Sequence, residues 1–331
     1  MILIKIRGGR AVDLRILERK FSDVEDCPSV LLANIHLSLD IQYNIAKMEH
    51  VIEIAHENEV NIVIFPELCV TGYIWATEDD QEIIDHMRAG DNGRISGWVN
   101  NVRDNLSEGG HGLQYVFYNN VRIKNGSFYN STFIINKYID HNDEDYIYDK
   151  IFLPPIEQRY FKKGTDKRLI IDTKWGRFGF LTCYDLNFVE LARKYAFVDE
   201  VDAIITMADW RSEAIREYPD MNIRTDHYYG FLWNLMNSSK AAYNQIWSLA
   251  VNSVGRHDIS GDYFWGGSGV WAPSGLMLLQ ASNINEELLI IRNLDIKGQR
   301  DKEQDTFNYR IDFQGVHRKI EEIESPTQYL P

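Results

Sequence analysis

The sequence predicts a layered α/β fold that also contains antiparallel strand pairs, and three observations support this prediction. Short runs rich in Val, Ile and Leu, such as residues 29–35 and 61–65, predict strands of a sheet that is covered on both faces. A helical segment between these two runs completes a βαβ unit. Later aromatic and β-branched runs, separated by tight turns, predict hairpins.

The first part of the chain is an extension of residues 1–28, with a short strand-like start followed by a charged stretch. A buried strand over 29–35 then leads to a helix over 44–59. Apolar residues recur every three or four positions in that helix, and Asn44 is its expected N-cap. The next strand covers 61–65.

In the middle of the chain, two helices precede a series of strands. We predict helices over 81–87 and 96–105, followed by strands over 113–118, 128–136, 145–148, 169–173 and 177–182. The last two strands are joined by a tight turn over 174–176, which contains a glycine.

In the last part of the chain, helices alternate with strands before two final strand pairs. We predict a helix over 187–195, a strand over 201–207, a helix over 225–243, and two strand pairs that join 246–252 with 270–272 and 276–280 with 288–294. Because no internal repeat or low-complexity linker occurs, we expect one domain over 29–298. The charged tail over 299–331 is either a frayed terminus or an arm that contacts another subunit.

Charge and cysteine content exclude several classes of function. Acidic residues outnumber basic residues by 49 to 35, and the resulting net charge of −14 argues against nucleic acid or an anionic membrane as partner. The apolar runs are too short to span a bilayer, and the N-terminus lacks the features of a signal peptide. The 3 cysteines form no Cys-x-x-Cys pair, which argues against a disulfide framework and a zinc site. We therefore expect a soluble cytoplasmic protein without a bound metal.

Three reactive side chains follow predicted strands. Cys183 lies at the carboxyl end of the strand over 177–182, just before a helix, where a helix dipole favours a thiolate. Glu67 and Lys150 follow two other strands. Each of these residues taken alone has an ordinary structural explanation. Together, a base, a cation and a nucleophile at strand ends can attack a carbon–nitrogen bond, and ligands usually bind at that edge of an α/β sheet.

Three blocks of sequence around these residues resemble the catalytic blocks of the nitrilase (carbon–nitrogen hydrolase) superfamily. They are residues 65–73 (FPELCVTGY), 150–157 (KIFLPPIE) and 179–193 (GFLTCYDLNFVELAR). The blocks occur in the order and strand context of the family, and the resemblance covers roughly residues 29–296. One departure is Val189, where the family commonly has proline.

The resemblance implies a four-layer α-β-β-α sandwich with a Glu–Lys–Cys triad and no cofactor. Cys183 is then the nucleophile, and Glu67 is the base that takes the thiol proton. Lys150 and the backbone N–H of Tyr184 stabilise the oxyanion. Glu157 matches the additional glutamate of amidase members and is expected to position Lys150 or the nitrogen of the substrate.

The residues near the nucleophile favour an amide over a nitrile as substrate. Cys183 is followed by Tyr184 and Asp185, as in amidase and carbamoylase members, whereas nitrilases usually have Trp and Glu there. The resemblance therefore implies an amidohydrolase that cleaves a small linear amide through a thioester. An N-carbamoyl amine or amino-acid hydrolase and an acyltransferase remain alternatives, and a nitrilase is a weaker one.

Further residues are expected to line the substrate pocket. Tyr73, Tyr184, Asp209 and Trp210 are the candidates for its walls. A buried Asp209 would select an amine-bearing substrate, whereas an inward-facing Arg211 would select a carboxylate. The sequence does not show which of the two side chains faces inward. The insert over 212–226 is expected to cover the site. Family members usually form homodimers or larger even-numbered oligomers, so we expect the same here.

Overall fold

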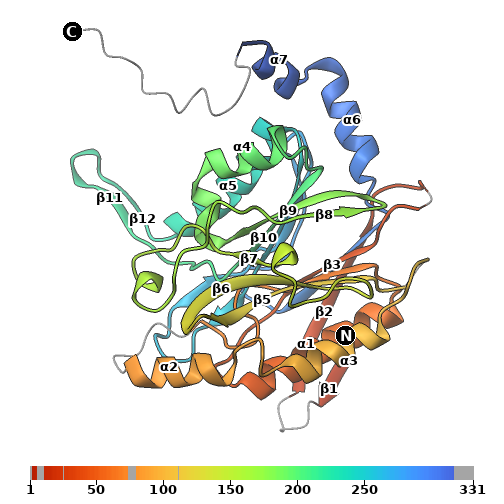
Figure 1. Ribbon diagram of the computed structural model, residues 1–331. Coiled ribbons are helices and arrows are strands. Elements are labelled where there is room, and N and C mark those ends of the chain that lie inside the picture. Colours follow the sequence, from red (N-terminus) through yellow and green to blue (C-terminus); the bar gives the residue numbers. More distant parts are fainter. Residues whose placement is uncertain (1, 6–10, 25, 74–79, 111, 317–331) are drawn as a thin grey trace.

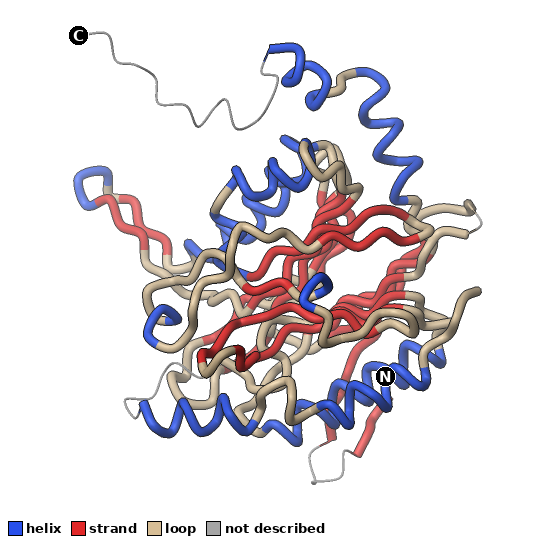
Figure 2. Tube along the Cα trace, in the orientation of Figure 1, coloured by secondary structure: helices blue, strands red, loops and turns tan. Residues whose placement is uncertain are grey.

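A computed structural model describes residues 2–5, 11–24, 26–73, 80–110 and 112–316 of the chain. Two sheets lie face to face at the centre of the molecule, and helices cover both outer faces (Figures 1 and 2). This arrangement confirms the predicted α-β-β-α sandwich. Among the described helices, none combines the length and the apolar character that crossing a bilayer requires.

The larger sheet has eight strands in the order β1-β2-β18-β3-β4-β5-β6-β7. Their bounds are β1 (Ile2–Lys5), β2 (Ala11–Lys20), β3 (Val30–Asn34), β4 (Ile62–Ile64), β5 (Tyr115–Lys124), β6 (Ser127–Ile135), β7 (Tyr148–Asp149) and β18 (Glu287–Arg292). Strands β3, β4 and β5 are parallel, and this places the residues after β4 at the same edge as the end of β3.

The smaller sheet has six strands in the order β17-β16-β13-β10-β9-β8. Their bounds are β8 (Ile170–Thr173), β9 (Gly176–Thr182), β10 (Ala203–Ala208), β13 (Trp247–Asn252), β16 (Gly269–Trp271) and β17 (Met277–Gln280). The central strands β9, β10 and β13 are parallel, so their carboxyl ends, including Thr182 and Asn252, meet at one edge. The candidate nucleophile follows that edge directly.

Helices pack on both outer faces. The helices are α1 (Ile41–Glu57), α2 (Asp80–Ala89), α3 (Ser96–Asn105), α4 (Val189–Phe197), α5 (Tyr228–Asn244), α6 (Ile296–Thr306) and α7 (Tyr309–Val316). Met48 of α1 and Val99 of α3 pack in one core with Leu31 of the larger sheet, and Leu191 of α4 packs with Ile204 of the smaller sheet.

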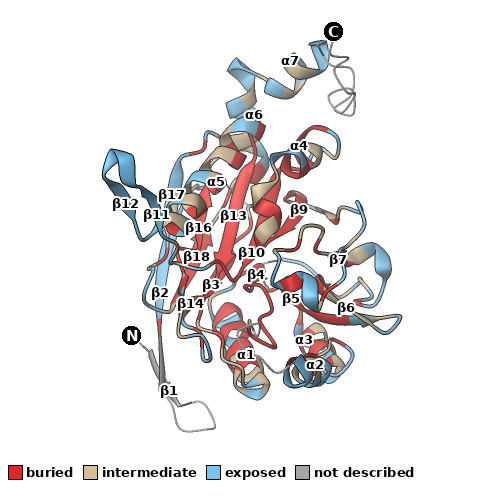
Figure 3. Ribbon diagram, turned by 90° about the vertical axis from the view of Figure 1, so that its left-hand side faces the viewer, coloured by how far each residue is buried: buried red, intermediate tan, exposed pale blue. Residues whose placement is uncertain are grey.

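Strand β3 shows why its sequence is apolar throughout. Val30 and Leu32 face the core between the two sheets, whereas Leu31 and Ala33 face the core under α1. Successive side chains of a strand point to opposite faces, so a strand buried on both faces has no place for a polar residue. Figure 3 shows this buried interior between exposed helical surfaces.

Three predictions about local structure are wrong. The N-cap of α1 is Asp40, whose carboxylate accepts from the backbone N–H groups of Gln42 and Tyr43, because the helix begins one turn earlier than its apolar pattern. The first half of the predicted strand over 145–148 belongs to the 3₁₀ helix Glu144–Tyr146, and only Tyr148 lies in a strand, β7. Strand β17 does not pair with β18: β17 pairs with β16, and β18 lies between β2 and β3 of the other sheet.

The described residues near both ends of the chain pack against the two-sheet domain. Strand β2 pairs in parallel with β18 and so extends the larger sheet. Near the C-terminus, Ile296 is buried and Arg300 forms an ion pair with Asp202. Residues 317–331 of the tail lie outside the described residues. The boundaries that we predict for extension, domain and tail stay predictions.

The insert over 212–226 does not lie flat on the body. It contains the hairpin of β11 (Arg216–Tyr218) and β12 (Ile223–Thr225), which projects outward beside α5 (Figures 1 and 3). Every residue of these two strands is exposed. A second small pair, β14 (Val254–Arg256) and β15 (Tyr263–Trp265), lies at the base of the hairpin, where Arg211 bridges to Phe264.

Candidate active site

Strand ends from both sheets bring the predicted triad together. Glu67 follows β4 and Lys150 follows β7 in the larger sheet, whereas Cys183 follows β9 in the smaller sheet. Glu67 and Lys150 have no exposed side-chain surface, and Cys183 keeps 9% of its surface exposed. The site therefore lies between the two sheets, at the edge where their parallel strands end.

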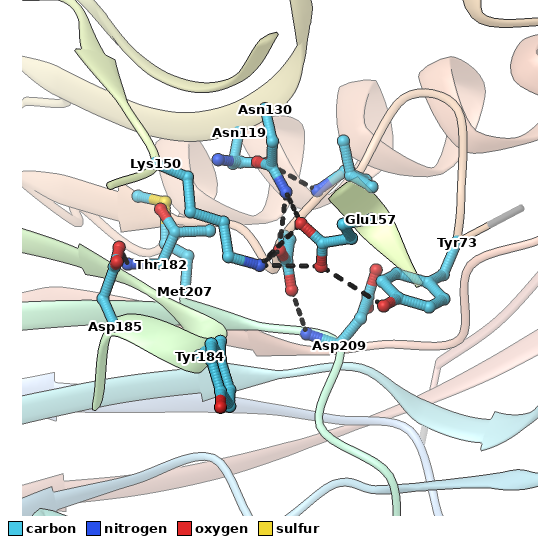
Figure 4. A network of polar contacts seen from close by, with 12 residues as sticks. Tyr73, Asn119, Asn130, Lys150, Glu157, Thr182, Tyr184, Asp185, Met207 and Asp209 are labelled. Atoms are coloured by element: carbon cyan, nitrogen blue, oxygen red, sulfur yellow. Dashed lines mark hydrogen bonds and ion pairs between the residues drawn. The ribbon is translucent and has the colours of Figure 1, made fainter. Parts of the chain in front are cut away.

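The Lys150 ammonium joins two carboxylates (Figure 4). Its Nζ lies 2.7 Å from Oε1 of Glu67, and 2.8 Å and 3.0 Å from the two carboxylate oxygens of Glu157. Glu157 is fully buried in the 3₁₀ helix Glu157–Arg159. The predicted partnership of Glu157 with Lys150 is therefore present in the structure. Buried charges of this kind persist only when they are paired and hydrogen-bonded.

Two neighbouring groups fix the orientation of the Glu67 carboxylate. The Nδ2 of Asn130 donates to Oε1 of Glu67 at 2.7 Å, and the backbone N–H of Asp209 donates to Oε2 at 2.9 Å. Asn130 also reaches Oε2 of Glu157 at 3.5 Å. One carboxylate is thus held by three donors from three different segments, which leaves it little freedom to rotate.

Cys183 lies on a sharp turn between strand and helix. Its φ is +46°, in the left-handed region that non-glycine residues rarely occupy, and it begins the 3₁₀ helix η3 (Cys183–Asn187). Such backbone strain is held in place only by surrounding structure, and it is common at functional sites. The turn directs Cys183 away from the strand ladder and into the core cluster that contains Trp210 and Trp233.

Asp185 fastens this turn to the segment that carries Lys150. Its carboxylate accepts from the backbone N–H of Thr182 at 3.0 Å, from the hydroxyl of Tyr148 at 2.7 Å, and from the backbone N–H of Phe152 at 2.8 Å. Burial raises the pKa of Asp185 to about 6, although Lys150 and these hydrogen bonds lower it. Asp185 has a positioning role.

Burial and neighbouring charges set the protonation of the reactive groups. Burial raises the pKa of the Cys183 thiol well above its usual value, and Glu67 raises it further, whereas Lys150 lowers it. Burial lowers the pKa of Lys150, but Glu157 and Glu67 outweigh it and hold that pKa well above its usual value. Burial raises the pKa of Glu157 to about 7. Burial therefore favours the thiol form of Cys183 over the thiolate, which is the stronger nucleophile.

The residues that we predict to line the substrate pocket differ in their contacts. Tyr73 donates from its hydroxyl to Oε1 of Glu157 at 3.2 Å, so its side chain reaches the cluster. The ring of Tyr184 packs edge-on against Phe188, and its backbone follows Cys183 directly. Trp210 is buried, and its indole N–H donates to the carbonyl of Tyr229.

Asp209 faces inward and Arg211 does not. Asp209 is 3% exposed, and its Oδ1 accepts from the hydroxyl of Ser253. The Arg211 side chain is 45% exposed and pairs with Asp262 at the surface. Arg211, Asp262 and Tyr73 line a small outer cavity, so Tyr73 lies between that cavity and the buried carboxylates. A larger cavity of about 850 Å³, lined by Cys27 and Asn61 among others, lies at the opposite ends of β3 and β4.

Comparison with a family model shows to which family the chain belongs. The model described as Carbon-nitrogen hydrolase matches residues 30–301, which is most of the chain. The chain belongs to the carbon–nitrogen hydrolase family. A probable nitrilase of Schizosaccharomyces pombe is 26% identical to it over 262 residues, which cover 78% of this chain and 84% of the relative. An N-carbamoylputrescine amidase of Solanum lycopersicum is 25% identical over 283 residues, or 82% of this chain and 87% of the relative.

Solved structures share the fold of this carbon–nitrogen hydrolase. The protein XC1258 of Xanthomonas campestris, a CN-hydrolase superfamily protein, superposes with a TM-score of 0.67 at 18% sequence identity. The match covers 86% of this chain and 97% of that protein. Within the residues that the structure describes, no three His, Cys, Asp or Glu side chains are placed to hold a metal ion together.

Sequence reasoning missed the amides that support the triad of this hydrolase. Asn130 in β6 and Asn119 in β5 are fully buried, and Asn119 accepts from the backbone N–H of Leu68 at 2.8 Å, next to Glu67. The sequence signal that could have identified these two residues is an asparagine inside a run of otherwise apolar or β-branched residues. A buried asparagine must find hydrogen-bond partners, so such a position indicates a polar site nearby.

Proposed function

We propose that this carbon–nitrogen hydrolase cleaves a small linear amide by way of a thioester on Cys183. The observation that carries the proposal is the Lys150 ammonium held between Glu67 and Glu157 at the turn that bears the thiol. One group can remove a proton, one can stabilise an oxyanion and one can attack carbon.

In the first half of the reaction, Glu67 takes the proton of the Cys183 thiol as sulfur attacks the amide carbon. The carbonyl oxygen becomes an oxyanion, which the Lys150 ammonium and the backbone N–H of Tyr184 stabilise. Glu67 then gives its proton to the nitrogen, the C–N bond breaks, and ammonia or an amine leaves. The acyl group remains on sulfur as a thioester.

In the second half, Glu67 takes a proton from water, and the resulting hydroxide attacks the thioester carbon. Lys150 again stabilises the oxyanion. The C–S bond breaks, the sulfur recovers its proton from Glu67, and a carboxylic acid leaves. Glu157 keeps Lys150 in place through both halves, because it contacts the same Nζ with two oxygens.

Hydrolysis of an N-carbamoyl amine is a second candidate. It is favoured by the similarity to the N-carbamoylputrescine amidase of Solanum lycopersicum, which covers 82% of this chain. The same triad would form a carbamoyl rather than an acyl thioester, and water would release carbamate. Acyl transfer to an amine uses the same first half, so only the acceptor distinguishes it from hydrolysis.

Ammonia release from a panel of small amides, N-carbamoyl amines and nitriles tests the proposal. We expect turnover of amides, loss of turnover in Cys183→Ala, and an acyl adduct on Cys183 by mass spectrometry after brief exposure to substrate. Cys27→Ala is the matched control, since Cys27 lies at the distant cavity, and it should keep both turnover and adduct.

The same panel separates the alternatives. Faster turnover of N-carbamoyl amines than of the matching amides would favour the second candidate. Hydroxylamine that outcompetes water for the thioester would favour acyl transfer, and activity restricted to nitriles would favour a nitrilase. Silence across the whole panel would refute the proposal.

A further inference from the structure

One oxygen of the Asp209 carboxyl has no partner in the part of the chain that the structure describes. Oδ1 accepts from the hydroxyl of Ser253, but Oδ2 is enclosed and receives no hydrogen bond from a described residue. Buried polar atoms in proteins nearly always find a partner, and the exceptions call for an explanation such as a ligand. Asp209 is 3% exposed, so bulk solvent does not supply that partner.

The charges around Asp209 do not balance. Three buried carboxyl groups, those of Glu67, Glu157 and Asp209, surround the single ammonium of Lys150. If all three were ionised, the cluster would carry an excess of negative charge in a buried region, which is costly. Burial raises the pKa of Asp209 well above its usual value, and Glu67 raises it further, although Ser253 and Lys150 lower it. These effects favour the protonated form of the Asp209 carboxyl.

Asp209 also lies close in the chain to a residue that lines the outer cavity. Its backbone N–H holds Glu67, and two residues later Arg211 lines the outer cavity together with Tyr73. Figure 4 shows the side chains of Asp209 and Tyr73 close to Glu157, and Asp209 contributes to the electrostatic environment of the Tyr73 hydroxyl. Tyr73 therefore lies between the outer cavity and the buried carboxyl groups, which include Asp209.

We propose that Asp209 recognises a protonated amine carried on the chain of the substrate, so that the preferred substrates are linear amides bearing an ammonium group. This inference rests on the proposed amide hydrolysis and adds its substrate class. The ammonium donates to the unpartnered Oδ2 and supplies the positive charge that the cluster lacks. An anionic substrate is disfavoured, because Arg211 lies outside and is already paired with Asp262.

Binding of such a substrate replaces the proton on Asp209 with the positive charge of the substrate ammonium. The neutral Asp209 carboxyl loses its proton to solvent and becomes a carboxylate that pairs with the substrate ammonium. The total charge of the cluster stays the same, so the cost of burying it does not rise. A neutral amide offers no such exchange and leaves Asp209 protonated.

The first test compares three series of amides of equal chain length, with an ammonium, a methyl or a carboxylate at the far end. We expect kcat/KM to be highest for the ammonium series at its best chain length. In Asp209→Asn, which keeps an oxygen for Ser253 and the backbone N–H for Glu67, the ratio of ammonium to methyl kcat/KM should fall roughly 100-fold. A purely structural role would lower both series and leave that ratio unchanged.

Asp262→Asn is the matched control, since Asp262 is a carboxylate at the exposed rim of the outer cavity. Its solvent exposure screens its charge, so the same ratio should change by less than about 3-fold. A preference for the carboxylate series, or a ratio that falls equally in both variants, would overturn the assignment. Hydrolysis of the methyl series without any preference would leave the proposed function standing and refute only the role of Asp209.

Proton release gives a second, independent readout. Calorimetry of Cys183→Ala with an ammonium-bearing amide, in buffers of different ionisation enthalpy, should show release of about one proton per site. The methyl analogue should release none, and Asp209→Asn should release none with either ligand. Equal proton release with both ligands would contradict the exchange.

Discussion

The Asp185 carboxylate accepts a hydrogen bond of 2.8 Å from the backbone N–H of Phe152, and this bond joins the two sheets at the active site. Asp185 belongs to the turn that begins with Cys183, whereas Phe152 follows Lys150 by two residues. The same carboxylate also holds Thr182 and Tyr148. One buried carboxylate therefore connects the turn that carries Cys183 with the segment that carries Lys150.

Asp185→Asn should loosen this connection. An asparagine presents one acceptor oxygen instead of two, so at least one of the three donors around Asp185 loses its partner in a buried place. We expect a loss of about 1–3 kcal/mol in the free energy of unfolding, and a lower kcat/KM because the triad is misplaced. Denaturant unfolding and steady-state kinetics measure the two effects. Asp172→Asn, on an exposed carboxylate paired with Arg177, should change neither, and equal behaviour of the two variants would contradict this role.

The pH profile of the hydrolase should report the shared protons of the cluster. With burial raising the pKa of Glu157 to about 7, kcat/KM should rise with pH through an acid limb near neutrality, as the carboxylates lose their shared proton. Glu157→Gln removes one negative charge, so the remaining groups ionise more easily and the limb should move to lower pH. Its maximum should fall, because Lys150 loses a charged partner. If the acid limb of Glu157→Gln lay at the same pH as that of the parent protein, Glu157 would not contribute to this titration.

The reactive residues of the site were predictable from the sequence, whereas their supports were not. Glu67, Lys150 and Cys183 follow strands, and strand ends gather at one edge of a sheet, so a local pattern carries spatial information. Asn130 meets Glu67 only because β4, β5 and β6 lie side by side in the larger sheet, and no local pattern encodes that order.

The same distinction applies to the fold. The length and period of a strand are local properties, which is why β9, β10 and β13 were anticipated. The partners of β18 are set by tertiary packing instead. Its apolar sequence suits either sheet, and it joins the larger one between β2 and β3. The projecting hairpin of β11 and β12 was also not foreseen, because exposed strands of three residues have no buried face to impose a pattern.

Lys240 is a buried cation whose removal should stabilise the protein. It lies in α5, with its ammonium bonded to the hydroxyl of Thr206 and the side-chain oxygen of Asn237, at 2.5 and 3.1 Å. Burial lowers the pKa of Lys240 from 10.5 to about 7. Lys240→Met keeps the volume and removes the charge, and Asn237 keeps its bond from Ser248. We expect a gain of roughly 1–4 kcal/mol in the free energy of unfolding at pH 6.

The gain from Lys240→Met should depend on pH in one direction. Below pH 7 both folded and unfolded chains carry the charge, so the cost of burying it is complete. Between pH 7 and 10.5 the unfolded chain binds a proton that the folded chain has released, so the stability of the parent protein rises with pH. The difference between parent and variant should therefore shrink from pH 7 upward. A difference that stays constant up to pH 10 would refute the assignment of this titration to Lys240.

The C-terminal helices should contribute to stability within one subunit. Arg300 pairs with Asp202, Gln245 donates to the carbonyl of Phe307 at 2.7 Å, and the ring of Phe313 lies 5.5 Å from that of Phe197. Removal of residues 299–331 should lower the melting temperature by several degrees. Light scattering of the truncated chain shows whether the tail also acts as a subunit-contact arm. An unchanged oligomer would restrict the tail to this internal role.

An apolar row on α5 is where we expect another subunit to bind. Phe231, Leu235 and Tyr243 are 60%, 46% and 56% exposed, and Phe231 and Leu235 lie one turn apart on the same side of the helix. We propose that this row forms the contact of a homodimer or a larger even-numbered oligomer. The double variant Phe231→Glu, Leu235→Glu should dissociate it, because two buried carboxylates would face the partner without a counter-charge. Sedimentation of the parent protein should show the oligomer, and Tyr138→Glu, at an exposed position outside α5, should leave it intact. A monomeric parent protein at micromolar concentration would contradict the proposal.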